Sequence, residues 1–240
     1  MIFNILGSNM SIQDKFIFLV AFVGAAMFAI MLHEWAHAWV ALKNGDLTAK
    51  LQGRLTLNPR AHFDPIGLLM FVFVGFGWAK PVPINSSNFE NKKVGIFTTA
   101  IAGVIMNFVV AFLSFGILCL LLLIPEQAVL NSTIFTVIYK LLYYFFYISV
   151  MLNGSLIAFN ILPIYPLDGF RVVESFTKPT NGYVKFMYHY GSFILLGVLI
   201  ISSFLPAQWD IFSLYFSAVQ NLINKIFQAI WGTIFVGVGF

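Results

Sequence analysis

The pattern HExxH at residues 33–37 places three ionisable side chains in an otherwise apolar stretch, and it constrains the chain more than any other feature. On a helix, His33 and His37 lie on one face, so both imidazoles can reach one metal ion. Glu34 lies beside them, where its carboxylate can contact a metal-bound water without being a ligand. Residues 16–32 carry no charge, and charges at membrane depth usually mark function. The alternative, two histidines hydrogen-bonded within a helix bundle, leaves Glu34 unexplained.

The composition indicates a polytopic membrane protein. Of the 240 residues, 60% are hydrophobic and only 9% are charged, and the mean hydropathy is +0.91, far from the average of soluble proteins. The net charge of +4 comes from basic residues in the connections between apolar segments, which excludes the dense basic stripe of a nucleic-acid-binding protein. The lipid bilayer is therefore the expected partner, and the single Cys119 excludes an intrachain disulfide.

The apolar segments predict an all-α fold of four to five transmembrane helices in one membrane-embedded domain spanning 1–240. A helix needs about 20 apolar residues to cross a bilayer. Segments of that length lie at 16–42, 94–124, 136–161 and 186–205. In the tail, 211–240, polar and apolar residues occupy different helical faces, which fits an interfacial amphipathic helix as well as a fifth span.

The connection at 43–93 predicts both the orientation and an irregular element. It holds seven basic and three acidic residues, which places it on the cytoplasmic side of a cell membrane by the positive-inside rule. Residues 50–57 alternate polar and apolar, the period of a half-buried strand. The apolar run at 66–78 is too short for a simple crossing. We therefore expect a strand-containing, partly re-entrant loop at 48–84.

Asp168 is the acidic residue best placed to join the two histidines. Pro163 and Pro166 cannot continue the third helix, so the chain turns just before Asp168. Counting spans places this turn at the same membrane face as His33 and His37. The alternative for Asp168 is a turn-forming role in an Asp-Gly pair.

Together these residues predict a catalytic zinc site. A catalytic zinc ion needs three protein ligands and one open position, and His33, His37 and Asp168 supply the three. Glu34 would take a proton from water and return it to the leaving amine of an amide.

Four further polar residues have roles that the sequence leaves open. Asn107 and Asn160 are uncharged donors at membrane depth, suited equally to holding a substrate backbone or oxyanion and to interhelical hydrogen bonding. His62 could approach the metal from its loop, although a local hydrogen bond is the simpler interpretation. His189, between two tyrosines, fits a satisfied interfacial residue.

The HExxH pattern and the distant segment from Asn160 to Gly169 together resemble the site-2 protease family of intramembrane zinc metalloproteases. The resemblance covers residues 16–175. It implies one Zn²⁺ bound by the two histidines and by the Asp of an LDG motif, here Asp168, with the motif glutamate as the catalytic acid and base. The family also carries an Asn that aligns with Asn107 and another that opens the NxxPxxPLDG pattern, here Asn160.

The resemblance further implies the substrate and the branch of the family. Site-2 proteases cleave transmembrane segments of other membrane proteins, often to release a regulator. The turn at 125–135 leaves no room for the PDZ domain of some members, and residues 77–83 resemble a recurrent loop segment of the compact bacterial branch. We therefore expect a multi-pass protein of the bacterial inner membrane with its active site toward the cytoplasm. An edge strand at 50–57 would then be suited to pair with an unwound substrate.

A different class of function also fits the ligand set. In a membrane metal-binding protein or zinc transporter, the same residues would pass zinc across the bilayer. That function predicts polar residues continuing along the spans, and residues 16–32 supply none that is charged.

Overall fold

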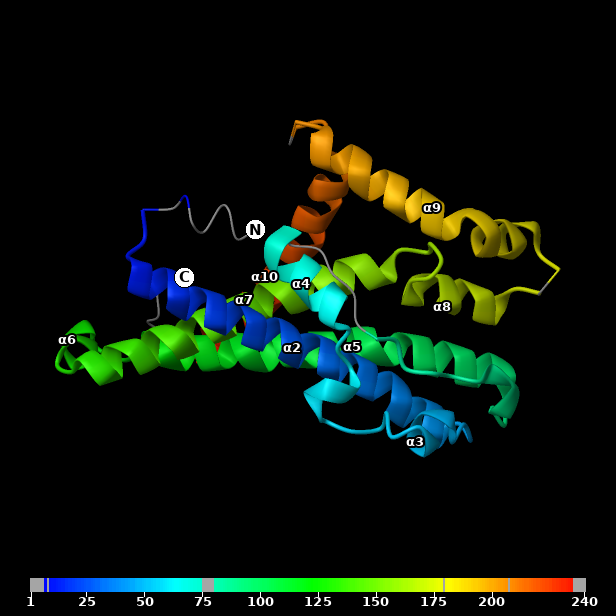
Figure 1. The fold of residues 1–240 in the computed structure, drawn as a ribbon, viewed down its shortest axis with the longest axis horizontal. Coiled ribbons are helices and arrows are strands. Elements are labelled where there is room, and N and C mark those ends of the chain that lie inside the picture. Colours follow the sequence, from blue (N-terminus) through cyan, green and yellow to red (C-terminus); the bar gives the residue numbers. More distant parts are fainter. Residues whose placement is uncertain (1–6, 8, 75–79, 179, 207, 235–240) are drawn as a thin grey trace.

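The computed structural model describes residues 7, 9–74, 80–178, 180–206 and 208–234. These residues form helices and connections without a strand, so the predicted all-α fold is confirmed (Figure 1). The longer helices are α2 (Ile12–Lys43), α5 (Lys92–Leu122), α7 (Thr133–Ile161), α9 (Gly182–Phe204) and α10 (Ile211–Ile234). The shorter ones are α3 (Thr48–Leu51), α4 (Pro65–Val74), α6 (Glu126–Leu130) and α8 (Asp168–Phe176).

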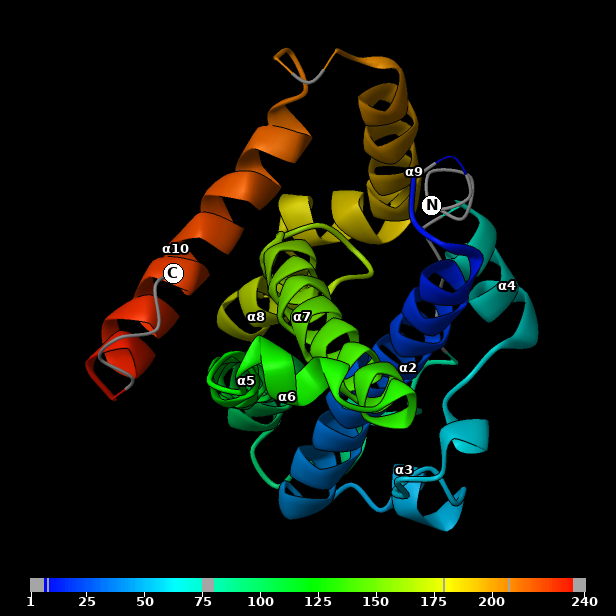
Figure 2. The ribbon, with the colours of Figure 1, turned by 90° about the vertical axis from the view of Figure 1, so that its left-hand side faces the viewer.

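Four of these helices, α2, α5, α7 and α9, are long and apolar enough to cross a membrane. The protein is therefore a multi-pass membrane protein. α10 is not among the four; it packs through the buried Phe227 and Ile223 against α5 and α7. α9 and α10 diverge from the connection between them, on one side of the other long helices (Figure 2).

The centre of the fold is the bundle of α2, α5 and α7, which lie side by side in both views (Figures 1 and 2). α2 turns a series of alanines inward, including Ala21 and Ala25, which pack with Ile148 of α7. Small residues let helix backbones approach closely where there is no hydrophobic driving force between helices. Between α5 and α7, the buried hydroxyls of Ser114 and Ser149 lie 3.1 Å apart. This close packing fixes the position of the motif-bearing end of α2.

The predicted strand at 50–57 is wrong. Its first residues belong to α3, and the chain then turns at Gly53, whose φ of +65° is incompatible with a strand. The alternation of polar and apolar residues does not reflect two faces, because Arg54 is buried and donates a hydrogen bond to the carbonyl of Lys80. Because this strand does not form, the hypothesis that an edge strand pairs with the substrate is also wrong.

The following apolar run forms the short helix α4. The side chain of Asp64 accepts hydrogen bonds from the amides of Ile66 and Gly67, both at 2.9 Å, and so begins the helix. Ile66, Leu69 and Phe73 are exposed on its surface. Residues 75–79 of the predicted re-entrant loop, including part of the segment that resembles the compact branch, lie outside the described residues, as do residues 235–240 of the tail.

A buried carboxylate joins the end of α2 to the segment that precedes α5. Asp46 is 0% exposed and accepts hydrogen bonds from the amides of Thr48 (3.1 Å) and Asn85 (2.8 Å) and from the side-chain amide of Asn88 (2.8 Å). Gly45, at φ +100°, lets the chain turn directly after α2. Burial alone would raise the pKa of Asp46, but the hydrogen bonds hold it below its ordinary value of 3.8.

We expect Asp46→Asn to lower the free energy of unfolding at pH 7 by about 1–3 kcal/mol, because buried amides lose an ionised acceptor. A group with a depressed pKa stabilises the fold above its ordinary pKa, and that contribution is lost as the pH falls through the folded value. The difference between wild type and variant should therefore persist from pH 7 to about 5 and shrink below about 4. Thermal unfolding in detergent measures it. The exposed neighbour Glu90→Gln is the control, and an equal loss in both variants would contradict the prediction.

Candidate metal centre

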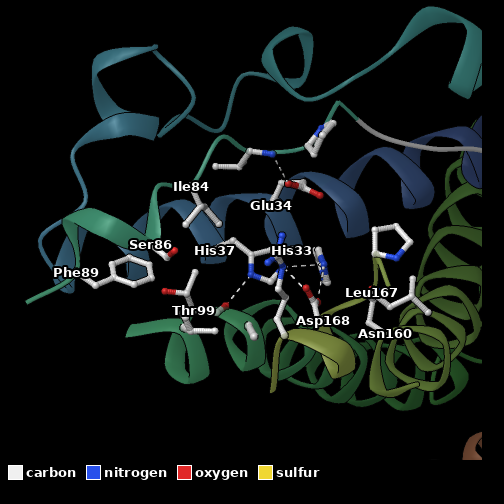
Figure 3. Close-up of a pocket in the computed structure, with 16 residues that line it drawn as sticks. His33, Glu34, His37, Ile84, Ser86, Phe89, Thr99, Asn160, Leu167 and Asp168 are labelled. Atoms are coloured by element: carbon white, nitrogen blue, oxygen red, sulfur yellow. Dashed lines mark hydrogen bonds and ion pairs between the residues drawn. The ribbon is translucent and has the colours of Figure 1, made fainter. Parts of the chain in front are cut away.

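α2 and α8 bring His33, His37 and Asp168 close to one another (Figure 3). The Nε2 atoms of the two imidazoles are 3.0 Å apart, and each lies 3.3 Å from Oδ2 of Asp168. Both histidines are buried, at 7% and 6% exposed. Three potential ligand atoms therefore converge on one point inside the helix bundle.

The local sequence explains how Asp168 arrives there. α7 ends at Ile161, and the proline-containing connection leads to α8, of which Asp168 is the first residue. A Cβ at Gly169 would overlap the backbone carbonyl of Ile161. Glycine is therefore required where the start of α8 lies against the end of α7, and this contact places the preceding carboxylate.

The orientation of the imidazoles comes from α5. Nδ1 of His37 lies 2.7 Å from the carbonyl oxygen of Thr99, so Nδ1 donates its proton and Nε2 presents a lone pair toward Asp168. A Cβ at Gly103 would overlap both the His33 ring and Nε2 of His37. In α5, the Thr99 carbonyl thus holds the His37 ring by a hydrogen bond, and Gly103 leaves room for both rings because it has no side chain.

The donor set fits a zinc ion. Two imidazole nitrogens and one carboxylate oxygen face one another at short range, and Oδ2 of Asp168 is buried without a hydrogen bond from the described residues. Two histidines with one carboxylate are a typical set of protein ligands for a catalytic zinc, which binds neutral imidazoles and an ionised carboxylate.

A cavity of about 390 Å³ opens beside these three residues. Glu34 and Asn160 line it, together with the segment that contains Val82. One carboxylate oxygen of Glu34 accepts a hydrogen bond of 2.9 Å from the amide of Val82 (Figure 3). Glu34 thus faces the same space as the potential ligands and is held by the chain across the cavity.

The other candidates of the sequence analysis lie elsewhere. Asn107 is 0% exposed, does not line the cavity, and neither of its side-chain polar atoms has a hydrogen-bond partner among the described residues. His62 is buried in its loop with Nε2 at 2.7 Å from the carbonyl oxygen of Thr56, so the local interpretation holds. His189 packs its ring against Tyr190 on α9.

Sequence reasoning missed three contributors: the carbonyl of Thr99, the missing side chain of Gly103 and the amide of Val82. Two are backbone groups, which no side-chain pattern reveals. Gly103 is part of an apolar span, and its position four residues before Asn107 was the available signal.

Apolar spans around a buried two-histidine, one-carboxylate cluster define a class of membrane-embedded metalloenzyme. The chain belongs to one family of that class, peptidase family M50, the site-2 protease family, whose model matches residues 21–199. As a member of this family it is a zinc metalloprotease. The connection between α5 and α7 holds only the five residues of α6 as regular structure, in keeping with a branch that lacks an inserted PDZ domain.

Relatives are found in bacteria and archaea. The chain is 36% identical over 199 residues to the "Putative zinc metalloprotease YwhC" of Bacillus subtilis. The matched region covers 82% of this chain and 88% of that protein. It is 27% identical to the "Putative zinc metalloprotease Rip2" of Mycolicibacterium smegmatis, over 78% of this chain and 68% of the relative. The zinc metalloprotease MJ0392 of Methanocaldococcus jannaschii is 26% identical over 74% of this chain and 40% of its own length. No solved structure matches the chain significantly.

We expect Gly103→Ala to weaken zinc binding at least about ten-fold, because the added methyl group displaces both imidazoles. Zinc retained during dialysis against a graded chelator series measures the affinity. Gly197→Ala, where a Cβ meets no atom within 4 Å among the described residues, is the matched control. Unchanged zinc affinity in the Gly103 variant would show that the rings do not depend on this gap.

Proposed function

We propose that this protein hydrolyses a peptide bond in or near a transmembrane segment of another membrane protein, with zinc held by His33, His37 and Asp168. The observation that carries the proposal is the convergence of three potential ligand atoms, two of them from buried histidines on α2, a helix long and apolar enough to cross a membrane. His37 lies six residues before the end of α2 at Lys43, about 9 Å along the helix axis. A bond cleaved there lies inside the membrane or at its edge.

In this proposal the protein residues divide the work of amide hydrolysis. When bound, zinc supplies a Lewis acid that makes water more acidic and polarises a carbonyl. Glu34 accepts the proton from water and delivers it to the leaving nitrogen. The amide of Val82, 2.9 Å from its carboxylate, keeps Glu34 directed into the cavity.

Asn160 is suited to hold the substrate. It lines the cavity, and one side-chain N–H is engaged with the carbonyl of Leu156 at 3.0 Å, which leaves the second N–H and the oxygen for a backbone amide. A peptide in the cavity must be unwound at that point, because helical backbone groups are already paired. Asn107 does not line the cavity, and its side chain makes no hydrogen bond with the described residues, so it has no part in this proposal.

The charge distribution supports an active site toward the cytoplasm of a cell membrane. Figure 1 shows the end of α2, α3, the start of α5 and α8 at one end of the molecule. Most lysines and arginines lie in or beside these elements, and connections rich in such residues stay on the cytoplasmic side. The release of a cytoplasmic fragment, as in regulated intramembrane proteolysis, follows from this orientation.

The decisive experiment is cleavage of a model single-span substrate in detergent by wild type and Glu34→Gln, with bound zinc quantified in both. We expect the variant to retain stoichiometric zinc and to cleave at least about 100-fold more slowly. Glu126→Gln, an exposed glutamate on α6, is the matched control. Removal of zinc by a chelator should abolish cleavage, and zinc should restore it.

Two results would count against the proposal. Full cleavage by the Glu34 variant would remove the assigned role of this carboxylate. Zinc flux into vesicles carrying the wild type, without cleavage of any single-span substrate, would favour the transporter function instead.

Val82→Pro tests the loop contact separately, since proline removes one amide proton in a segment that already contains prolines on both sides. We expect a fall in kcat of about ten-fold with zinc content unchanged. Val82→Ala is the control, because it shortens the same side chain and keeps the amide whose hydrogen bond Glu34 accepts. Equal effects of the two substitutions would show that the side chain of Val82, and not its amide, supports activity.

A further inference from the structure

A second cavity, of about 330 Å³, lies beside the catalytic one where α5, α8 and the start of α9 meet. Its floor includes the buried Ser175 and Val184, and its rim carries Lys92, Lys93 and Lys178, all exposed. Lys92 and Lys93 begin α5, whereas Lys178 lies in the connection after α8. The fold therefore gathers three ammonium groups around one hollow.

The charge in this cavity is not compensated by the protein. None of the three lysines forms an ion pair with the described residues. The single acidic residue of the lining, Glu174, is engaged by Arg171 at 2.9 Å and by the hydroxyl of Tyr188. Lys93 also lies 4.9 Å from the ring centroid of Phe176, which holds it at the rim. The cavity thus presents a net positive charge with a shaped floor.

The N-terminus of α5 also favours a bound anion. The first turn of α5 contains Lys92 and Lys93 and no acidic residue. Positive side chains are unfavourable at a helix N-terminus, where the macrodipole already concentrates positive charge and unpaired amides. An anion in the cavity would satisfy the lysines and the helix end together.

The position at the ends of two spans indicates the kind of anion. α5 begins at Lys92 and α9 at Gly182, so the cavity lies where both helices reach the membrane surface. The neighbouring Phe176 is 62% exposed, and Val94 and Phe186 are also exposed. Basic pockets flanked by apolar surface at this level suit a phosphate with attached acyl chains.

We propose that this basic cavity binds a phosphate-bearing anion, supplied by the headgroup of an anionic phospholipid or by free phosphate. The ligand lies next to the catalytic cavity, since Ile96 lines both spaces. Arg171, on the catalytic side, is bonded to Glu174, on the basic side. The site is separate from the zinc residues, and binding is measured without any assay of cleavage.

The test equilibrates the purified full chain in nonionic detergent with phosphatidylglycerol or phosphatidylcholine and counts bound lipid by native mass spectrometry. The variant carries Lys92→Gln, Lys93→Gln and Lys178→Gln. The matched control carries Lys43→Gln, Lys50→Gln and Arg60→Gln at the same end of the molecule but outside the cavity lining. A third variant with arginine at positions 92, 93 and 178 keeps the charge.

We expect wild type, the control and the arginine variant to prefer phosphatidylglycerol, and the glutamine variant to lose at least about ten-fold in affinity. Displacement of the lipid by inorganic phosphate would identify free phosphate as a source, and resistance to it would identify the lipid headgroup. Equal binding by wild type and the glutamine variant would overturn the proposal, as would an equal loss in the control. Unchanged thermal unfolding of the glutamine variant separates loss of the site from loss of the fold.

Discussion

The close approach of α5 to α2 at Gly103 is the constraint on which the candidate metal centre depends. At this contact the backbone of one helix touches the two imidazoles of the other, and one turn earlier the Thr99 carbonyl fixes the His37 ring. The inward alanines of α2 serve the same purpose along the rest of its length. A larger side chain at this contact would preserve a membrane bundle but separate the groups that must meet. In this fold, the small residues at helix contacts determine where the imidazoles and the carboxylate lie.

The second constraint is electrostatic. Two imidazoles, two carboxylates and several amides lie close together at the depth of apolar spans, where unpaired polar groups are costly. The carbonyl of Thr99, the amide of Val82 and the mutual contacts of the potential ligands satisfy most of these groups. Among the described residues, Nδ1 of His33 and Oδ2 of Asp168 are buried without a hydrogen bond, and Oδ2 is directed at the two Nε2 atoms. Its lack of a hydrogen bond is what a metal ligand requires.

The sequence predicts those features that depend on local side-chain patterns, and it does not predict contacts made by the backbone of distant segments. The apolar runs gave the long helices because burial in lipid imposes length and composition, and the HExxH spacing gave the histidine pair because helical geometry is local. Asp168 was found because two prolines fixed where α7 ends. The strand at 50–57 was wrong because a short alternation does not distinguish a sheet from a turn, whereas Gly53 and the inward Arg54 decide the matter. Backbone partners such as the Val82 amide leave no trace in a pattern of side chains.

The order of the ligands along the chain has a consequence for biosynthesis. His33 and His37 emerge on the first span, but Asp168 follows α7, after two further spans have entered the membrane. The Thr99 carbonyl that orients His37 also comes later, on α5. A partly synthesised chain therefore contains Glu34 and two of the three potential ligands without Asp168. If these residues hold zinc as proposed, proteolytic activity cannot precede the synthesis of Asp168.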